Sequence, residues 1–234
     1  MIPELTHTVS LNYLNQMASN LSKVNYVKHG TLVALYILII WGLYRYLFKL
    51  PDNIEELVVK PLLWLIPVIF FVRKEGLGLA SLGFTLKNLF PSIYLSLAIG
   101  VVFVGEALII NYLKYGQFDF SANVGQMQLS SALFLSFATA VTEEVTFRGY
   151  VFNRVWAALN NEWVANIAVS VVWALVHLPI TVFIWNLSFS GSLTYLLLTT
   201  LFGIGSAFVF ARTRNILSPI ILHVMWEWPI ILFR

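Results

Sequence analysis

The chain has 234 residues, of which 59% are hydrophobic and only 11% are charged, whereas soluble domains are about 45–50% apolar and about 25% charged. This composition indicates a membrane protein and leaves no room for a separate soluble domain. The net charge of +3 comes from basic residues scattered singly along the chain, without the dense basic run that nucleic-acid binding requires. The absence of cysteine excludes a disulfide framework, a thiolate zinc site and a cysteine nucleophile.

Residues 1–30 form a polar arm that precedes the first apolar run. Apolar residues recur in this arm at spacings of three and four, which predicts an amphipathic helix lying at the membrane interface; these residues are Leu11, Leu14, Met17, Leu21 and Val24. A loosely ordered arm is the alternative. The apolar run that starts at Thr31 has no small-residue cleavage signature, so we expect a retained anchor rather than a cleaved signal peptide.

The remaining sequence is divided into apolar runs with little chain between them. A membrane-spanning helix needs about 20 apolar residues, so we expect an all-α fold, a polytopic transmembrane helical bundle of about seven to eight spans, in one domain over residues 31–234. The candidate spans are residues 31–49, 61–73, 91–113, 130–142, 163–185, 191–211 and 215–233. Two runs, 61–73 and 130–142, are short, and the second is expected to continue through the charged sequence after it.

Basic residues predict how these spans are oriented, because lysine and arginine are enriched on the cytoplasmic side of membrane proteins. With the amino terminus in the cytoplasm, nine basic residues fall on that side, namely Lys23, Lys28, Arg73, Lys74, Lys87, Arg148, Arg154, Arg212 and Arg214. Five fall on the opposite side, namely Arg45, Lys49, Lys60, Lys114 and Arg234. We therefore expect a cytoplasmic amino terminus.

The sequence TEEVTFRGY, residues 142–150, places two acids and an arginine between apolar runs. A charged side chain at the middle of a membrane helix costs about 2.5–3.5 kcal/mol on insertion scales, so these residues are expected to face a polar cavity inside the bundle. On a helix, Glu144 meets Arg148 four residues later, while Glu143 points elsewhere. Glu143 is thus the candidate general base and Glu144 a structural partner; the alternative is that both acids only bridge helices.

Two histidines are embedded in apolar sequence. His177 ends VVWALVH, and His223 stands in IILHVMWEW, four residues before Glu227, so that His223 and Glu227 share a helix face. A single histidine in a membrane helix is typically an interhelical hydrogen-bonding residue. Two histidines together with the acidic pair instead favour a reaction centre.

These motifs resemble a known family. EEVTFR fits an EExxxR pattern, WALVH is close to FxxxH, and RTRNILSPIILHVMWE is close to a basic loop followed by a histidine motif. In this order they are similar to the CPBP intramembrane proteases, also called the Abi or CAAX-protease family, which includes the type II CAAX prenyl endopeptidases. The match runs almost to the carboxyl terminus, whereas the first 90 residues carry little of it.

The resemblance implies an endopeptidase that cleaves membrane-associated peptides or proteins in a site within the membrane, open to the cytoplasm. It implies that Glu143 is the general base for a water, that Glu144 and Arg148 support it, that His177 assists the water and that His223 stabilises the oxyanion. It further implies a multi-pass protein, in a bacterial plasma membrane given the chain's size, with a membrane-embedded peptide or protein as substrate, the lipid bilayer as its surroundings and no nucleic-acid partner. It does not specify an oligomer.

Two positions depart from the family pattern. Trp173 replaces the usual phenylalanine, which we interpret as a packing change. Glu227 replaces asparagine or aspartate, and a glutamate donates to an oxyanion only when protonated; otherwise it holds the tautomer of His223, or the motif is degenerate. The alternative function is therefore a non-proteolytic regulatory or bacteriocin self-immunity protein. An ion pathway is disfavoured, because it predicts carboxylates distributed along a route through several helices.

The sequence is compatible with two ways of activating water. Glu143, His177 and His223 are the ligand types of a two-histidine, one-carboxylate zinc site with an open position. Alternatively, Glu143 and His177 polarise the water without a metal. There is no HExxH sequence to specify a metal site, so the metal-free arrangement is favoured and no cofactor is assigned.

Overall fold

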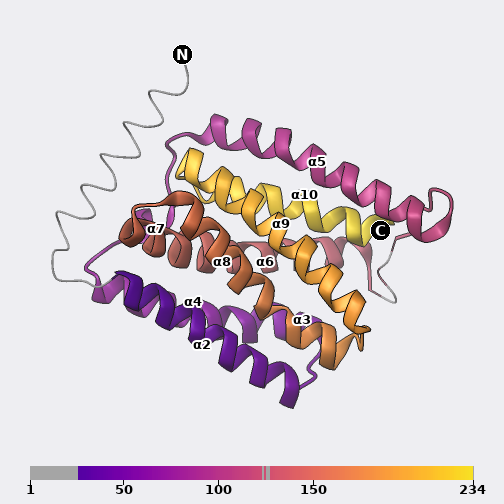
Figure 1. Cartoon of the computed structure of the whole chain (residues 1–234), viewed down its shortest axis with the longest axis horizontal. Coiled ribbons are helices and arrows are strands. Elements are labelled where there is room, and N and C mark those ends of the chain that lie inside the picture. Colours follow the sequence, from indigo (N-terminus) through magenta and orange to yellow (C-terminus); the bar gives the residue numbers. More distant parts are fainter. Residues whose placement is uncertain (1–25, 123, 125–126, 234) are drawn as a thin grey trace.

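The computed structural model describes residues 26–122, 124 and 127–233 (Figure 1). The amphipathic helix expected at residues 11–24 lies outside the described residues. The described part consists of helices and connecting loops, as expected, and contains no strand. Its elements are α2 (Tyr26–Leu47), α3 (Asp52–Ile54), η1 (Glu55–Val59), α4 (Lys60–Lys74), η2 (Leu79–Leu82), α5 (Leu89–Tyr115), α6 (Leu129–Glu144), η3 (Val145–Phe152), α7 (Asn153–Leu159), α8 (Glu162–Val176), η4 (Ile180–Ile184), α9 (Phe189–Thr213) and α10 (Leu217–Phe233).

Several of these elements join end to end into longer helical rods. The elements α3, η1 and α4 form one rod over residues 52–74, and α6, η3 and α7 form another over residues 129–159. The short apolar runs at 61–73 and 130–142 are therefore parts of longer helices, and the second continues through the acidic motif as expected. Within each rod lies a stretch of π-helix, η1 or η3, a local widening that is frequent at functional sites.

Four helical stretches of the described chain are long and apolar enough to cross a membrane, namely Tyr26–Leu47, Leu89–Tyr115, Glu162–Ile184 and Phe189–Thr213. The helix Leu217–Phe233 is apolar but shorter. Large apolar side chains remain exposed on the outside of the bundle, for example Val101 and Val102 on α5. Such a surface suits lipid rather than water, so the prediction of a transmembrane helical bundle is confirmed.

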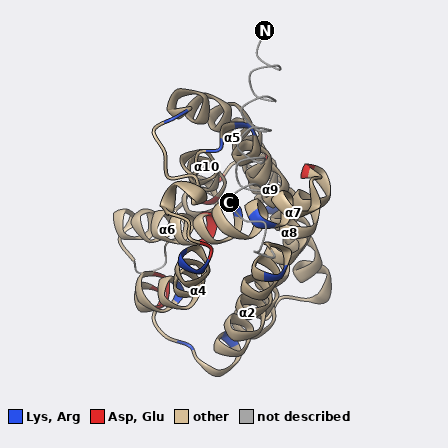
Figure 2. Ribbon diagram, turned by 90° about the vertical axis from the view of Figure 1, so that its left-hand side faces the viewer, with Lys and Arg blue, Asp and Glu red and all other residues tan. Residues whose placement is uncertain are grey.

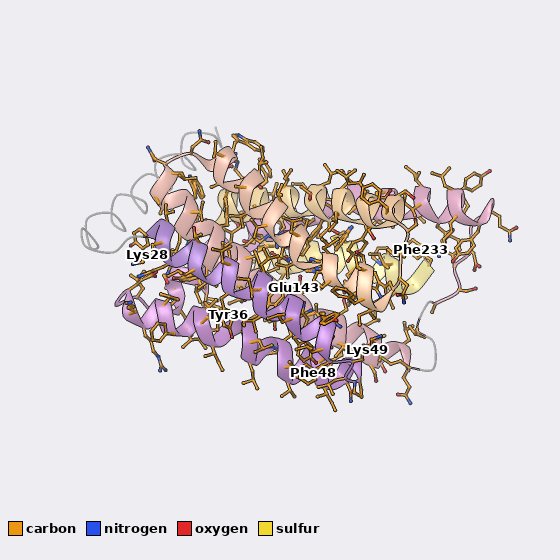
Figure 3. All side chains as sticks on the ribbon, turned by 60° about the horizontal axis from the view of Figure 1, so that its bottom comes forward. Lys28, Tyr36, Phe48, Lys49, Glu143 and Phe233 are labelled. Atoms are coloured by element: carbon orange, nitrogen blue, oxygen red, sulfur yellow. The ribbon has the colours of Figure 1, made fainter. Side chains whose placement is uncertain are left out.

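The rods run back and forth between two ends of the bundle (Figure 1). At the proximal end, where α2 begins, lie the loops at residues 75–88, 160–161 and 214–216. At the distal end lie the loops at residues 48–51, 116–128 and 185–188, together with the end of α10. Figure 3 shows Lys28 at the proximal end and Lys49 and Phe233 at the distal end, with Glu143 between them inside the bundle.

Aromatic side chains and small residues fill the interior. Trp64, Phe147 and Phe202 are almost completely buried, and the rings of Trp64 and Phe147 meet edge to face. In the GIGSA sequence, a Cβ atom added to Gly203 would lie 2.9 Å from Ser170 Cβ on α8. The helices α8 and α9 therefore approach closely at this position, as small residues allow.

Candidate active site

A cavity of about 360 Å³ lies within the distal half of the bundle, and we call it the central cavity. Its walls come from α2, α3, η1, α4, α6, η4, α9 and α10, together with His177 directly after α8. Ionisable side chains are concentrated in this lining: Arg45, Asp52, Glu56, Lys60, Glu143, His177, His223 and Glu227. Four of the six expected site residues, Glu143, His177, His223 and Glu227, thus share one cavity, although they come from three separate rods.

Glu143 is held at the last turn of α6 by groups from two other helices. Its Oε1 atom accepts a hydrogen bond of 2.9 Å from Lys60 Nζ on α4, and its Oε2 atom accepts one of 3.0 Å from Trp173 Nε1 on α8. Oε2 also lies 3.6 Å from His177 Nε2. The carboxylate is buried, so these contacts determine its orientation and compensate for the lost hydration of its charge.

His177 follows directly after α8, where the chain continues toward η4. Its Nδ1 atom donates a hydrogen bond of 2.9 Å to the carbonyl oxygen of Trp173. Because Nδ1 carries the proton, Nε2 of the neutral ring is an acceptor. Two acceptors, Nε2 and Glu143 Oε2, therefore face each other at 3.6 Å, a pair that can receive both hydrogen atoms of one water molecule.

Glu144 and Arg148 lie behind the cavity wall rather than in it. The expected ion pair is present, with Arg148 Nη1 3.2 Å from Glu144 Oε1, and the Arg148 guanidinium stacks on the Trp173 ring at 4.3 Å. Glu144 also accepts hydrogen bonds of 2.7 Å from Ser206 Oγ and 2.7 Å from His223 Nδ1. The side chain of Glu144 is completely buried, so it acts as a fixed acceptor that joins α6, α9 and α10.

His223 is positioned between two carboxylates. Its Nδ1 atom donates to Glu144, and its Nε2 atom lies 3.7 Å from Glu227 Oε2. The expectation that His223 and Glu227 share a helix face is correct, but Glu144 is the nearer partner. Glu227 is less buried, with 27% of its side chain exposed, and it accepts a hydrogen bond of 2.8 Å from Ser136 Oγ. Nε2 of His223 is thus the nitrogen that faces the cavity.

A chain of ion pairs runs along one wall of the cavity, and the sequence analysis missed it. Arg45 contacts both Glu55 and Glu56, and Lys60 Nζ lies 2.5 Å from Glu56 Oε2 and 2.9 Å from Glu143 Oε1. The sequence analysis counted Lys60 among the basic residues that orient the spans. Lys60 is buried, so including it in that count was wrong. The available signal was a Glu–Lys pair four residues apart, Glu56 and Lys60, directly beside a short apolar run.

The interpretation of Trp173 as a packing change also needs correction. Its ring is fully buried and packs against Phe202, Trp226 and both embedded histidines, but its Nε1 atom donates directly to the candidate base Glu143. A phenylalanine provides the same apolar surface without this donor. The departure from the family pattern is therefore chemical as well as steric.

The cavity residues do not fit the zinc site that the sequence left open. Among the described residues there is no group of three or more histidine, cysteine, aspartate or glutamate side chains arranged to hold a metal ion. His177 and His223 hold Nδ1 on a carbonyl and a carboxylate and keep Nε2 free, as zinc ligands would. However, Glu143 Oε1 is already paired with the Lys60 ammonium group, whose positive charge opposes a metal dication at the same carboxylate.

The order of the motifs and their convergence on one cavity can be compared with known families. Residues 125–229 match the family described as type II CAAX prenyl endopeptidase Rce1-like. No curated protein and no solved structure is significantly similar to the chain. The resemblance drawn from the motifs is confirmed over this segment, which contains all six expected site residues. The other members of the ion-pair chain, Arg45, Glu55, Glu56 and Lys60, lie outside it.

Proposed function

We propose that this protein is an intramembrane endopeptidase, with Glu143 and His177 activating a water that hydrolyses peptide bonds of membrane-associated peptides or proteins. The observation that carries the proposal is the 3.6 Å separation of Glu143 Oε2 and His177 Nε2 on the wall of a cavity inside an apolar bundle. The family match supports endopeptidase activity. We propose the plasma membrane of a bacterium as its location, on the size of the chain and the family resemblance.

In the first step, the water donates one hydrogen bond to Glu143 and one to His177. As its oxygen attacks the carbonyl carbon of the scissile bond, a proton passes to Glu143 and the carbonyl electrons move to the oxygen. Lys60 keeps the Glu143 carboxylate ionised before the attack, because an ammonium group 2.9 Å away stabilises the negative charge. Lys60 is therefore a positioning residue in this scheme.

The tetrahedral oxyanion needs a hydrogen-bond donor on the opposite side. Nε2 of a protonated His223 supplies it, since Glu144 holds Nδ1 of the same ring at 2.7 Å and stabilises the imidazolium. When the intermediate collapses, the carbon–nitrogen bond breaks, and the proton held by Glu143 passes to the leaving amine. Water addition and bond cleavage are thus balanced without a metal.

The experiment compares membrane peptides from cells that produce the wild-type protein with those from cells that produce Glu143→Gln. A fragment that disappears in the variant identifies the product by mass spectrometry. Glu162→Gln is the matched control, because Glu162 pairs with Arg212 at the bundle surface, away from the cavity. If folded Glu143→Gln protein yields the same fragments as wild type, the assigned chemistry is incorrect.

A second experiment tests whether the hydrolysis needs a metal. Purified protein is incubated with a metal chelator and then assayed for cleavage of the identified peptide. We expect activity to persist. Loss of activity that one added metal restores would show that a metal site forms when substrate binds and would overturn this part of the scheme.

A further inference from the structure

The helix α4 has a buried face and an exposed face. It lies between α2 and α6, as the view from the proximal end shows (Figure 2). The buried residues of α4 recur every four positions and are Lys60, Trp64, Val68 and Val72. The other face carries exposed large apolar side chains, namely Leu62, Ile66, Ile69 and Phe70. Such a face on a helix of a membrane bundle suits contact with the hydrocarbon chains of lipids.

A hollow of about 540 Å³ lies on the exposed face of α4, and we call it the α4 hollow. Its lining consists of Ile66, Ile69, Phe70, Arg73 and Lys74. The first four of these residues are spaced by three and four positions, so they follow one stripe along the helix. Arg73 and Lys74 belong to the last turn of α4, whereas Ile66 lies about 10 Å farther back along the axis, at 1.5 Å per residue. The α4 hollow therefore has a basic end and an apolar end.

The two basic side chains of the α4 hollow are not neutralised by a carboxylate of the described chain. Arg73 and Lys74 are exposed, and no ion pair joins either of them to another described residue. The next residue, Glu75, is buried and faces the other way. Its carboxylate accepts hydrogen bonds of 2.9 Å from Arg154 Nε and 2.8 Å from Tyr150 Oη. The positive charges of Arg73 and Lys74 are thus available to an anion in the hollow.

An anionic phospholipid matches both ends of the α4 hollow. A guanidinium group donates paired hydrogen bonds to phosphate oxygens, and an ammonium group adds a point charge. Basic side chains at the end of a membrane helix lie at the level of the lipid headgroups, and the apolar residues farther along the helix lie at the level of the acyl chains. A free phosphate ion would use only the basic end. In a zwitterionic lipid, the cation of the headgroup already accompanies the phosphate.

We propose that the α4 hollow binds an anionic phospholipid, with the phosphate at Arg73 and Lys74 and an acyl chain along Ile66, Ile69 and Phe70. None of these residues lines the central cavity, so the lipid site is separate from the candidate active site. The proposal does not depend on whether the protein cleaves peptides. A lipid that binds only the folded bundle also stabilises it by mass action.

The test measures lipid retention by purified full-length protein in detergent. Dioleoyl phosphatidylglycerol, which is anionic, or dioleoyl phosphatidylcholine, which is zwitterionic, is added at equal concentration, and bound lipid is counted by native mass spectrometry. We expect wild-type protein to prefer phosphatidylglycerol by about tenfold, and the double variant Arg73→Ala/Lys74→Ala to lose this preference. Phosphatidylglycerol should also raise the melting temperature of the wild type but not that of the double variant.

The matched control is the double variant Lys49→Ala/Lys114→Ala. It removes the same charge from two exposed residues at the distal end, and Lys114 also lies in the last turn of a helix, so its lipid preference should equal that of wild type. Excess inorganic phosphate should not displace the bound lipid. Four results would overturn the proposal: equal retention of the two lipids by wild type, the same loss of preference in the control, displacement by phosphate, or a lipid-free dimer that shows a second copy on this face.

Discussion

Lys60 and Glu143 form a buried ion pair of 2.9 Å across 83 residues of sequence. The pair joins α4 to the last turn of α6, and Glu56 provides a second carboxylate for the same ammonium group. The candidate base is therefore not an isolated acid in an apolar site. The charge of Glu143 is stabilised by Lys60 on α4, which lies outside the segment 125–229 that matches the family.

Replacing Lys60 tests this dependence. Lys60→Met preserves the length of the side chain but removes the charge, which leaves Glu56 and Glu143 buried without their shared cation. We expect a loss of about 3–5 kcal/mol in the free energy of unfolding and a fall in kcat that exceeds any change in KM. Lys60→Arg should recover part of both. Equal peptidase kinetics for Lys60→Met and wild type would contradict the positioning role.

Replacing each of the two adjacent glutamates in turn should distinguish a catalytic role from a structural one. Glu144→Gln removes the carboxylate that pairs with Arg148 and His223, so we expect unfolding to become easier by about 3–5 kcal/mol. Glu143→Gln leaves Lys60 paired with Glu56 and should lower kcat by about 10²–10⁴-fold, as expected for loss of a general base, with a smaller change in stability. Thermal unfolding in detergent and cleavage assays measure the two effects. Similar losses of stability in both variants would refute the division of roles.

Trp173→Phe tests whether the indole donor matters. The phenyl ring retains most of the buried surface but leaves Glu143 Oε2 without the 3.0 Å hydrogen bond. Loss of a donor to a buried acceptor costs about 1–3 kcal/mol, and we expect lower kcat from a less firmly oriented carboxylate. The variant should still unfold cooperatively. An unchanged kcat would show that Trp173 serves only to pack the interior.

Glu227→Asn restores the residue type usual in the family. Glu227 lies 3.7 Å from His223 Nε2, and an asparagine amide there donates a hydrogen bond without needing a proton. We expect peptidase activity equal to or above that of wild type, measured by product formation per unit of folded protein. If Glu227→Asn abolishes activity, the glutamate itself takes part in the reaction.

Gly203→Ala tests the close contact between α8 and α9. The added Cβ would lie 2.9 Å from Ser170 Cβ and 3.3 Å from Arg148 Nη2, so the two helices must separate and the Glu144–Arg148 pair must shift. We expect destabilisation of about 1–3 kcal/mol. At Gly105 on α5 nothing lies within 4 Å of an added Cβ, so Gly105→Ala, the matched control, should be neutral or stabilising by up to about 1 kcal/mol.

Much of the architecture could be predicted from the sequence, because the signals are local. Apolar runs gave the helical bundle and the approximate position of each rod, and the four-residue spacing gave the Glu144–Arg148 pair and the shared face of His223 and Glu227. Residues that are expensive to place in lipid pointed to the candidate site. These inferences need only the period of a helix and the cost of burying charge.

The tertiary structure determined which residues of different helices contact one another. The partnership of Lys60 with Glu143, the hydrogen bond from Trp173 and the contact of His223 with Glu144 join residues on different helices, and no local pattern specifies which faces of separate helices meet. By itself, the sequence determined a membrane bundle with ionisable groups at its centre, because apolar runs and the cost of burying charge are local signals. The packing of the helices decided how those groups are paired, because it brings together residues that lie far apart in the sequence.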